Sequence, residues 1–183
     1  MALEYIVSML RSDAPLTRKG KRQARALRDQ MSKRPFEIIV VSPLSRTIQT
    51  ATEIFGQSDV PKCLCHLMCE RSMMPSDTGT PSSELISKHP HVSSWSGLCH
   101  LPEEYWPKVS GKKAAEKDVA ERVEHFKTWL LARPETCMAL VGHSAFFRTM
   151  TGQPKLGNCE AFWCELRANG DLVPCSPLPE MPA

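Results

Sequence analysis

The sequence has no apolar run long enough to span a bilayer and no strong excess of charge of one sign. A transmembrane helix needs about 20 consecutive apolar residues, so we expect no membrane-embedded part. The formal net charge of +3 is too small to indicate a nucleic-acid or membrane-surface partner. The first ten residues also lack the basic start and apolar core of a secretory signal peptide. Together these absences predict a cytoplasmic protein.

The sequence also lacks cysteines and histidines at a spacing that is typical of a metal site. In a reducing compartment the eight cysteines are expected to remain thiols rather than form disulfides. Cys63, Cys65, His66 and Cys69 lie close together, but they fit no zinc pattern, and no second pair of ligands follows at a suitable distance. We therefore predict no metal site and no cofactor, and we interpret these cysteines as small buried or half-buried thiols.

Helix and strand patterns alternate along the chain, which is short enough for a single domain. Thr17 is a plausible N-cap, and Pro134 follows the longest helical pattern. The expected elements are helices at 18–32, 44–55, 112–133 and 145–151, and strands at 38–41, 138–141 and 159–166. This alternation predicts an α/β three-layer sandwich with a largely parallel central sheet. The irregular stretch 56–110 is expected to form a lid over a site, and 169–183 to form a loose tail.

A cationic side chain and an imidazole each come shortly after a predicted buried strand. Arg46 lies in the first turn of the helix that follows residues 38–41, and His143 follows residues 138–141 after the single residue Gly142. A guanidinium at a helix N-terminus offers a planar fork that matches two phosphate oxygens. An imidazole beside Gly142 could donate to a phosphoryl oxygen, because glycine lets the backbone approach a ligand closely. Each residue alone would more often be structural, but their parallel placement favours a phosphate site.

Two carboxylates are candidates for a general acid. Glu70 follows the apolar pair Leu67-Met68 and Cys69, and Asp77 precedes Thr78-Gly79. A leaving alcohol needs a proton, and a carboxylic acid shielded from water can hold one near neutral pH. Because apolar residues precede it, Glu70 is favoured, and Asp77 stays open as the alternative.

Four segments in order resemble the histidine phosphatase superfamily, in its phosphoglycerate-mutase-like branch. Residues 13–24 resemble its Asp-x-Pro-Leu-Thr-x-x-Gly-x-x-Gln-Ala helix start, and residues 42–51 its Ser-Pro-Leu-x-Arg-Thr-x-Gln-Thr-Ala segment. Residues 70–79 resemble the acid-bearing loop, and residues 141–144 the Val-Gly-His-Ser segment. Arg122 also stands where the family's long helix carries an arginine. The match covers roughly residues 13–166 and is specific because the four segments occur together.

The resemblance implies a phosphohistidine mechanism. In the family, a histidine of a first-strand Arg-His-Gly motif attacks phosphorus, a carboxylic acid protonates the leaving group, and water releases phosphate. Carried over, Arg46 and His143 would bind the phosphate, and His143 and Glu70 would act in catalysis. No histidine occurs before His66, so the Arg-His-Gly motif is absent. Residues 3–9 could form a strand in its place, but they contain no nucleophile.

The resulting expectation is a phosphomonoester phosphatase domain at 13–168, preceded by an atypical segment at 1–12 that arises from truncation or an alternative start. A mutase is less expected, because it would need further cationic groups around a closed pocket. Without the nucleophile this chain is expected to be weakly active or inactive. The alternative is a pseudophosphatase that binds a phosphorylated small molecule or phosphoprotein. The sequence does not indicate an oligomeric state.

Overall fold

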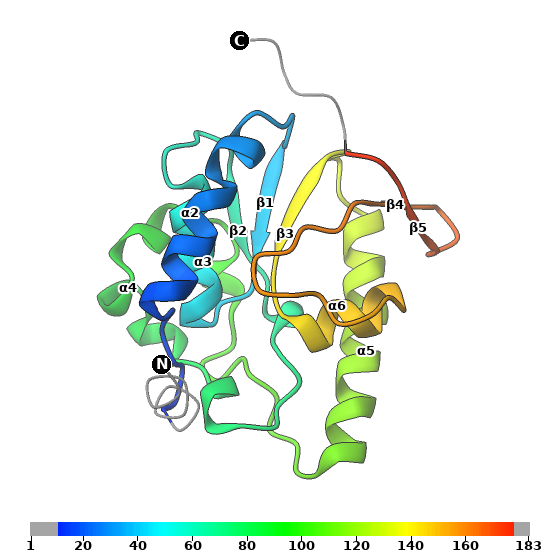
Figure 1. The fold of residues 1–183 in the computed structure, drawn as a ribbon. Helices are drawn as coiled ribbons and strands as arrows, with labels where there is room; N and C mark the ends of the chain where they lie inside the picture. The colour runs from blue at the N-terminus through cyan, green and yellow to red at the C-terminus, as the bar shows by residue number, and fades with distance from the viewer. Residues whose placement is uncertain (1–10, 178–183) are drawn as a thin grey trace.

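A parallel sheet of three strands forms the centre of the molecule (Figure 1). The computed structural model describes residues 11–177, and the strand order is β2-β1-β3. The strands are β1 (Ile38–Val41), β2 (Lys62–Leu64) and β3 (Met138–Val141). The strand predicted at 3–9 lies outside the described residues, so its replacement of a missing first strand stays a prediction.

Helices cover both faces of this sheet, which confirms the predicted α/β sandwich (Figure 1). The longer helices are α2 (Arg18–Ser32), α3 (Ser45–Phe55), α5 (Lys112–Leu131) and α6 (Ser144–Thr151). Thr17 caps α2 as expected, because its Oγ1 accepts a hydrogen bond of 3.1 Å from the amide of Gly20. No helix within residues 11–177 is long and apolar enough to cross a bilayer.

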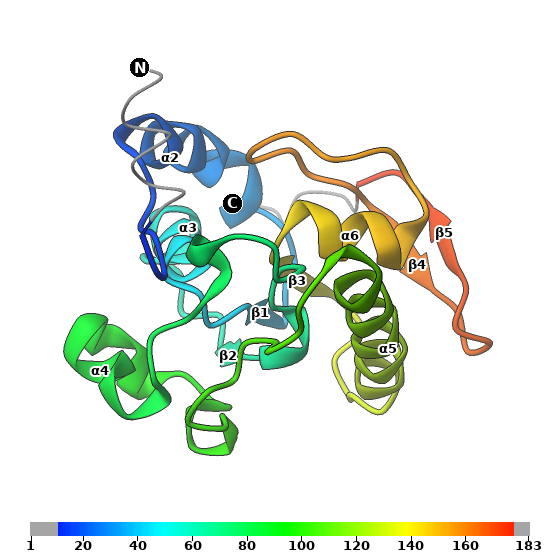
Figure 2. The ribbon, with the colours of Figure 1, turned by 90° about the horizontal axis from the view of Figure 1, so that it is seen from below.

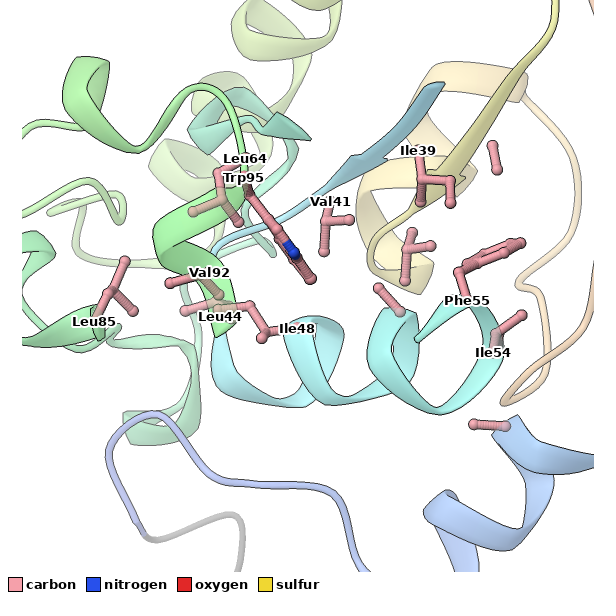
Figure 3. Close-up of a cluster of buried hydrophobic side chains, with 14 of the residues drawn as sticks. Ile39, Val41, Leu44, Ile48, Ile54, Phe55, Leu64, Leu85, Val92 and Trp95 are labelled. Atoms are coloured by element: carbon pink, nitrogen blue, oxygen red, sulfur yellow. The ribbon is translucent and has the colours of Figure 1, made fainter. Parts of the chain in front are cut away.

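The central strand β1 supplies both halves of the core. Successive side chains of a strand point to opposite faces. Ile39 and Val41 therefore belong to the cluster that packs on α3 (Figure 3). Ile38 and Val40 belong to the cluster on the other face, which includes residues of α5 and α6. Because all four side chains are buried, the strand reads as a continuous apolar run, which is typical of a parallel sheet covered on both sides.

The stretch 56–110 is more regular than predicted. It contains β2, a short helix α4 (Leu85–Lys88) and several single 3₁₀ turns. The turns are η1 (His66–Met68), η2 (Pro75–Asp77), η3 (Ser82–Glu84), η4 (Pro90–Ser94) and η5 (Leu98–His100). Seen from below, these segments lie around the carboxyl ends of the strands (Figure 2). They are therefore placed to border any site at that end of the sheet.

A separate antiparallel hairpin follows the sheet. It consists of β4 (Cys164–Leu166) and β5 (Leu172–Pro174). The prediction of a strand over 159–166 was too long, because only the last three of these residues pair with a neighbouring strand. The sequence pattern missed β5, which lies within the stretch 169–183. The turn signal Asn169-Gly170 connects the two strands, and Gly170 supplies the required positive φ of 85°.

Candidate functional site

The register of the sheet brings Ser42 and His143 together. Val41 of β1 pairs with Val141 of β3, so the residues that follow the two strands leave the sheet at the same level. The amide of Ser42 donates to the carbonyl oxygen of Val141 at 3.0 Å. The hydroxyl Oγ of Ser42 and Nε2 of His143 are hydrogen-bonded at 2.8 Å, and both residues are buried. The sequence analysis assigned no role to Ser42. A signal was present, because Ser42 follows β1 directly and His143 follows β3 after one glycine.

His143 is held in its neutral form. Burial lowers the pKa of the imidazole well below its usual value, and the charges of Arg46 and Arg122 lower it further. A neutral imidazole has one donor and one acceptor nitrogen, and Nε2 is engaged with Ser42. A neutral His143 adds no second positive charge beside Arg46.

We expect this burial to make the protein less stable below about pH 6.5. The unfolded chain protonates His143 near that pH, whereas the folded chain keeps it neutral. The stability is complete above the unfolded pKa and falls by up to about 1.4 kcal/mol for each pH unit below it. Urea unfolding from about pH 7.5 to about pH 5.5 should show a smaller loss for His143→Gln than for the wild type.

The comparison with His143→Gln is needed because burial also lowers the pKa of His66, His89 and His91. Those histidines are present in both proteins, so only the difference between the two pH profiles reports on His143. Identical profiles would contradict the assignment of a neutral, buried imidazole.

Arg46 points from the first turn of α3 toward the turn η2. Its Nη1 donates to the carbonyl oxygen of Ser76 at 2.6 Å, and its Nη2 donates to Oδ1 of Asp77 at 3.0 Å. The other carboxylate oxygen of Asp77 accepts from the amides of Met73 and Met74 at 3.2 and 3.0 Å. Asp77 thus shapes its own turn and fixes the guanidinium.

Glu70 has a different environment from Asp77. Its Oε1 accepts from the amide of Arg71 at 2.8 Å, and its Oε2 lies 3.5 Å from the amide of Ala145 at the start of α6. Burial raises the pKa of the Glu70 carboxyl, and the charge of Asp77 raises it further. Glu70 therefore keeps a proton to higher pH than a free glutamate does. This difference favours Glu70 over Asp77 as the candidate acid.

Arg122 reaches from α5 to the loop that carries Glu70. Its guanidinium donates to the carbonyl oxygens of Leu67 at 2.8 Å, Cys69 at 2.5 Å and Glu70 at 3.3 Å. It also pairs with Asp118 one turn earlier on α5 at 2.9 Å. Its side chain is only 11% exposed, so these contacts are shielded from water. The sequence placed an arginine on this helix but could not show that it fastens the loop.

Asp13 joins three segments behind the site. Its carboxylate accepts from the amide and hydroxyl of Ser45 at 2.7 and 2.6 Å, from Oγ1 of Thr80 at 2.5 Å and from Nζ of Lys88 at 2.9 Å. Ser45 is the first residue of α3, so Asp13 satisfies a backbone donor that the helix leaves unpaired. The segment 13–17 is thereby attached to the helix that positions Arg46.

The cysteines do not form a metal centre. Among residues 11–177, no group of three or more histidine, cysteine or acidic side chains is arranged to hold a metal ion. Burial raises the pKa of Cys65 to about 11 and that of Cys69 to about 12. Both thiols therefore stay protonated and unreactive near neutral pH.

Comparisons with known proteins agree with this architecture. The family model described as the histidine phosphatase superfamily (branch 1) matches residues 7–172. No curated protein sequence matches the chain. YhfR of Bacillus stearothermophilus is 17% identical, with a TM-score of 0.61 over 93% of this chain and 88% of that chain.

Two further solved structures are similar to this chain. A mycobacterial glucosyl-3-phosphoglycerate phosphatase solved with VO3 is 16% identical, with a TM-score of 0.58 over 94% of this chain and 92% of that chain. A histidine-to-alanine variant of a phosphoserine phosphatase from Entamoeba histolytica, solved with phosphoserine, is 18% identical, with a TM-score of 0.52 over 94% and 89%. At such low identity these likenesses establish the fold.

Proposed function

This chain belongs to the histidine phosphatase superfamily, and we propose that it binds phosphomonoesters at the carboxyl ends of β1 and β3 and hydrolyses them weakly or not at all. The observation that carries the proposal is the register of these strands. Arg46 and His143 follow strands that pair residue by residue from Ile38 to Val41, and the charge of Arg46 lowers the pKa of His143. The guanidinium of Arg46 and the neutral imidazole of His143 thus lie close together at the carboxyl ends of β1 and β3.

Each residue has a separate role in the proposed complex. The fork of Arg46 contacts two phosphate oxygens, and the neutral imidazole of His143 contributes a hydrogen bond. Arg46 is already paired with Asp77 at 3.0 Å, so a bound phosphate shares the guanidinium with this carboxylate or displaces it. We therefore expect binding of moderate strength rather than very tight binding.

The chemistry of the first step limits hydrolysis. The family mechanism requires a histidine that attacks phosphorus, and this sequence has no histidine before His66. If His143 became the nucleophile, the phosphate would lose this donor, and no replacement is evident. The Entamoeba phosphatase variant lacks one histidine and was nevertheless solved with phosphoserine. That complex supports the view that ligand binding survives the loss of a histidine in this fold.

An active phosphatase is the second candidate, and the state of Glu70 favours it. Burial raises the pKa of this carboxyl, which suits an acid that protonates a leaving group. A module that only binds phosphate has no need of such an acid.

The eight cysteines are free thiols, which supports our proposal of a reducing compartment such as the cytoplasm. A phosphoprotein is an alternative to a small phosphorylated ligand.

The test combines binding and turnover on the same chain. Calorimetry with inorganic phosphate should detect binding by the wild type and at least a tenfold loss in Arg46→Met, because charge-assisted hydrogen bonds contribute about 1.5–3 kcal/mol. Arg18→Met is the matched control, because Arg18 is an exposed arginine at the start of α2. Hydrolysis of para-nitrophenyl phosphate by the wild type should stay within a few-fold of that by Glu70→Gln.

Two outcomes would overturn the proposal. Equal phosphate affinity in the wild type and Arg46→Met would show that phosphate does not bind at the carboxyl ends of β1 and β3. Rapid turnover that both Glu70→Gln and His143→Gln abolish would show an active phosphatase instead. Urea unfolding of each variant separates these effects from simple loss of the fold.

A further inference from the structure

An open cavity of about 320 Å³ lies between the loop that carries η2 and the loop that precedes α5. Figure 1 shows both loops at the end of the sheet where the strands finish. The residues that line the cavity are Ser72, Met73, Met74, Pro75, Thr78, Val109, Ser110 and Gly111. Its volume falls within the range of small-molecule sites.

The wall of this cavity is tied directly to Arg46. Ser76 and Asp77 of η2 accept hydrogen bonds from the two terminal nitrogens of the guanidinium. Asp77 in turn accepts from the backbone amides of Met73 and Met74, two residues that are 45% and 38% exposed. The segment 73–77 therefore contacts the guanidinium through Ser76 and Asp77 and lines the cavity through Met73 and Met74. The guanidinium of Arg46 is thus connected to the cavity lining through the segment 73–77.

The lining carries no charged side chain, and its polar groups are hydroxyls and backbone atoms. Each cationic side chain that flanks it in sequence lies within ion-pair distance of a glutamate. Nη1 of Arg71 and Nζ of Lys112 lie 3.4 and 3.9 Å from the same oxygen, Oε1 of Glu116, and Lys108 pairs with Glu104. A carboxylate or second phosphate in the cavity would lose water without gaining a dedicated counterion. A neutral group would meet three hydroxyls together with methionine, proline and valine side chains.

We propose that this cavity receives the uncharged organic group of a phosphomonoester whose phosphate is held by Arg46 and His143. The ligand class is then a phosphomonoester of a neutral alcohol or phenol, and the second anionic group of a bisphosphate or a phosphorylated acid gains no affinity from the cavity. The unbranched side chains of Met73 and Met74 adapt to groups of different shape. This inference rests on the proposed function, because it takes the phosphate position from Arg46 and His143.

The experiment compares three probes by calorimetry: inorganic phosphate, phenyl phosphate and 4-carboxyphenyl phosphate. Phenyl phosphate is expected to bind at least about tenfold more tightly than inorganic phosphate, because its ring leaves water. The carboxyphenyl ester should bind no more tightly than inorganic phosphate. Val109→Asp places a negative charge on the lining and should lower the affinity ratio of phenyl phosphate to inorganic phosphate about tenfold. Ile86→Asp on α4, at an exposed position outside the cavity, should leave this ratio unchanged.

The possible outcomes separate the two proposals. If inorganic phosphate binds but phenyl phosphate binds no better, the cavity is not the subsite and the proposed function stands. If the carboxyphenyl ester binds as tightly as phenyl phosphate, the preference of the cavity for a neutral group is wrong. If no probe binds, both the proposed function and this inference are wrong. Equal changes of the ratio in Val109→Asp and Ile86→Asp also overturn the assignment.

Discussion

Replacing Asp13 by asparagine is expected to lower the free energy of unfolding by about 3 kcal/mol. The carboxylate is only 2% exposed and accepts four hydrogen bonds, from Ser45, Thr80 and Lys88. An asparagine has one acceptor oxygen in place of two and brings two donors into a site full of donors. Because Lys88 is 39% exposed, we attribute most of the loss to the buried hydrogen bonds rather than to the ion pair. Thermal unfolding should shift down by roughly 6–12 °C.

Asparagine is the informative substitution because of the backbone at this position. Asp13 has a φ of 44°, in the left-handed region that asparagine and aspartate tolerate better than other non-glycine residues. Asp13→Asn therefore changes the charge with little backbone strain, whereas Asp13→Ala should cost about 1 kcal/mol more. Asp29→Asn, at an exposed position of α2, is the matched control and should stay within about 0.5 kcal/mol of the wild type. A loss for Asp13→Asn no larger than that of the control would contradict the role of this network.

The sequence predicted those elements whose signals are local. The helices α2, α3 and α5 have apolar residues on one face and a clear beginning or end, and β1 and β3 are continuous apolar runs. The strand β2 was missed because three residues, Lys62–Leu64, carry no period of their own and become a strand only by pairing with β1. The strand β5 was missed for the same reason, since its pairing partner is β4.

The candidate site was predictable in its parts but not in its connections. Arg46 and His143 each follow an apolar run, which is visible in the sequence. Their approach depends on the register of β1 and β3, which the sequence does not encode in any short segment. The sequence favoured Glu70 over Asp77 only from the apolar residues that precede it, whereas the burial of Glu70 and the contact of Asp77 with Arg46 depend on the fold.

Arg122→Met is expected to have the largest effect of the substitutions considered, a loss of roughly 3–5 kcal/mol in the free energy of unfolding. Methionine fills a similar length but leaves the carbonyl oxygens of Leu67, Cys69 and Glu70 without their shared donor. It also leaves Asp118 without its partner at 2.9 Å. The loop that carries Glu70 would then lose its attachment to α5. Urea unfolding measures the stability.

A second readout distinguishes the electrostatic effect of Arg122 from its structural effect. The charge of Arg122 lowers the pKa of His143, so its removal should raise that pKa toward the ordinary value. The extra loss of stability below about pH 6.5 should then be smaller in Arg122→Met than in the wild type. Arg122→Lys keeps the charge but not the planar fork, so it should lose stability while retaining the pH dependence of the wild type. Arg148→Met, at an exposed position of α6, should change neither quantity. If Arg122→Lys behaved like the wild type in both measurements, the three carbonyl contacts would contribute little, and the loop would be held by its buried side chains instead.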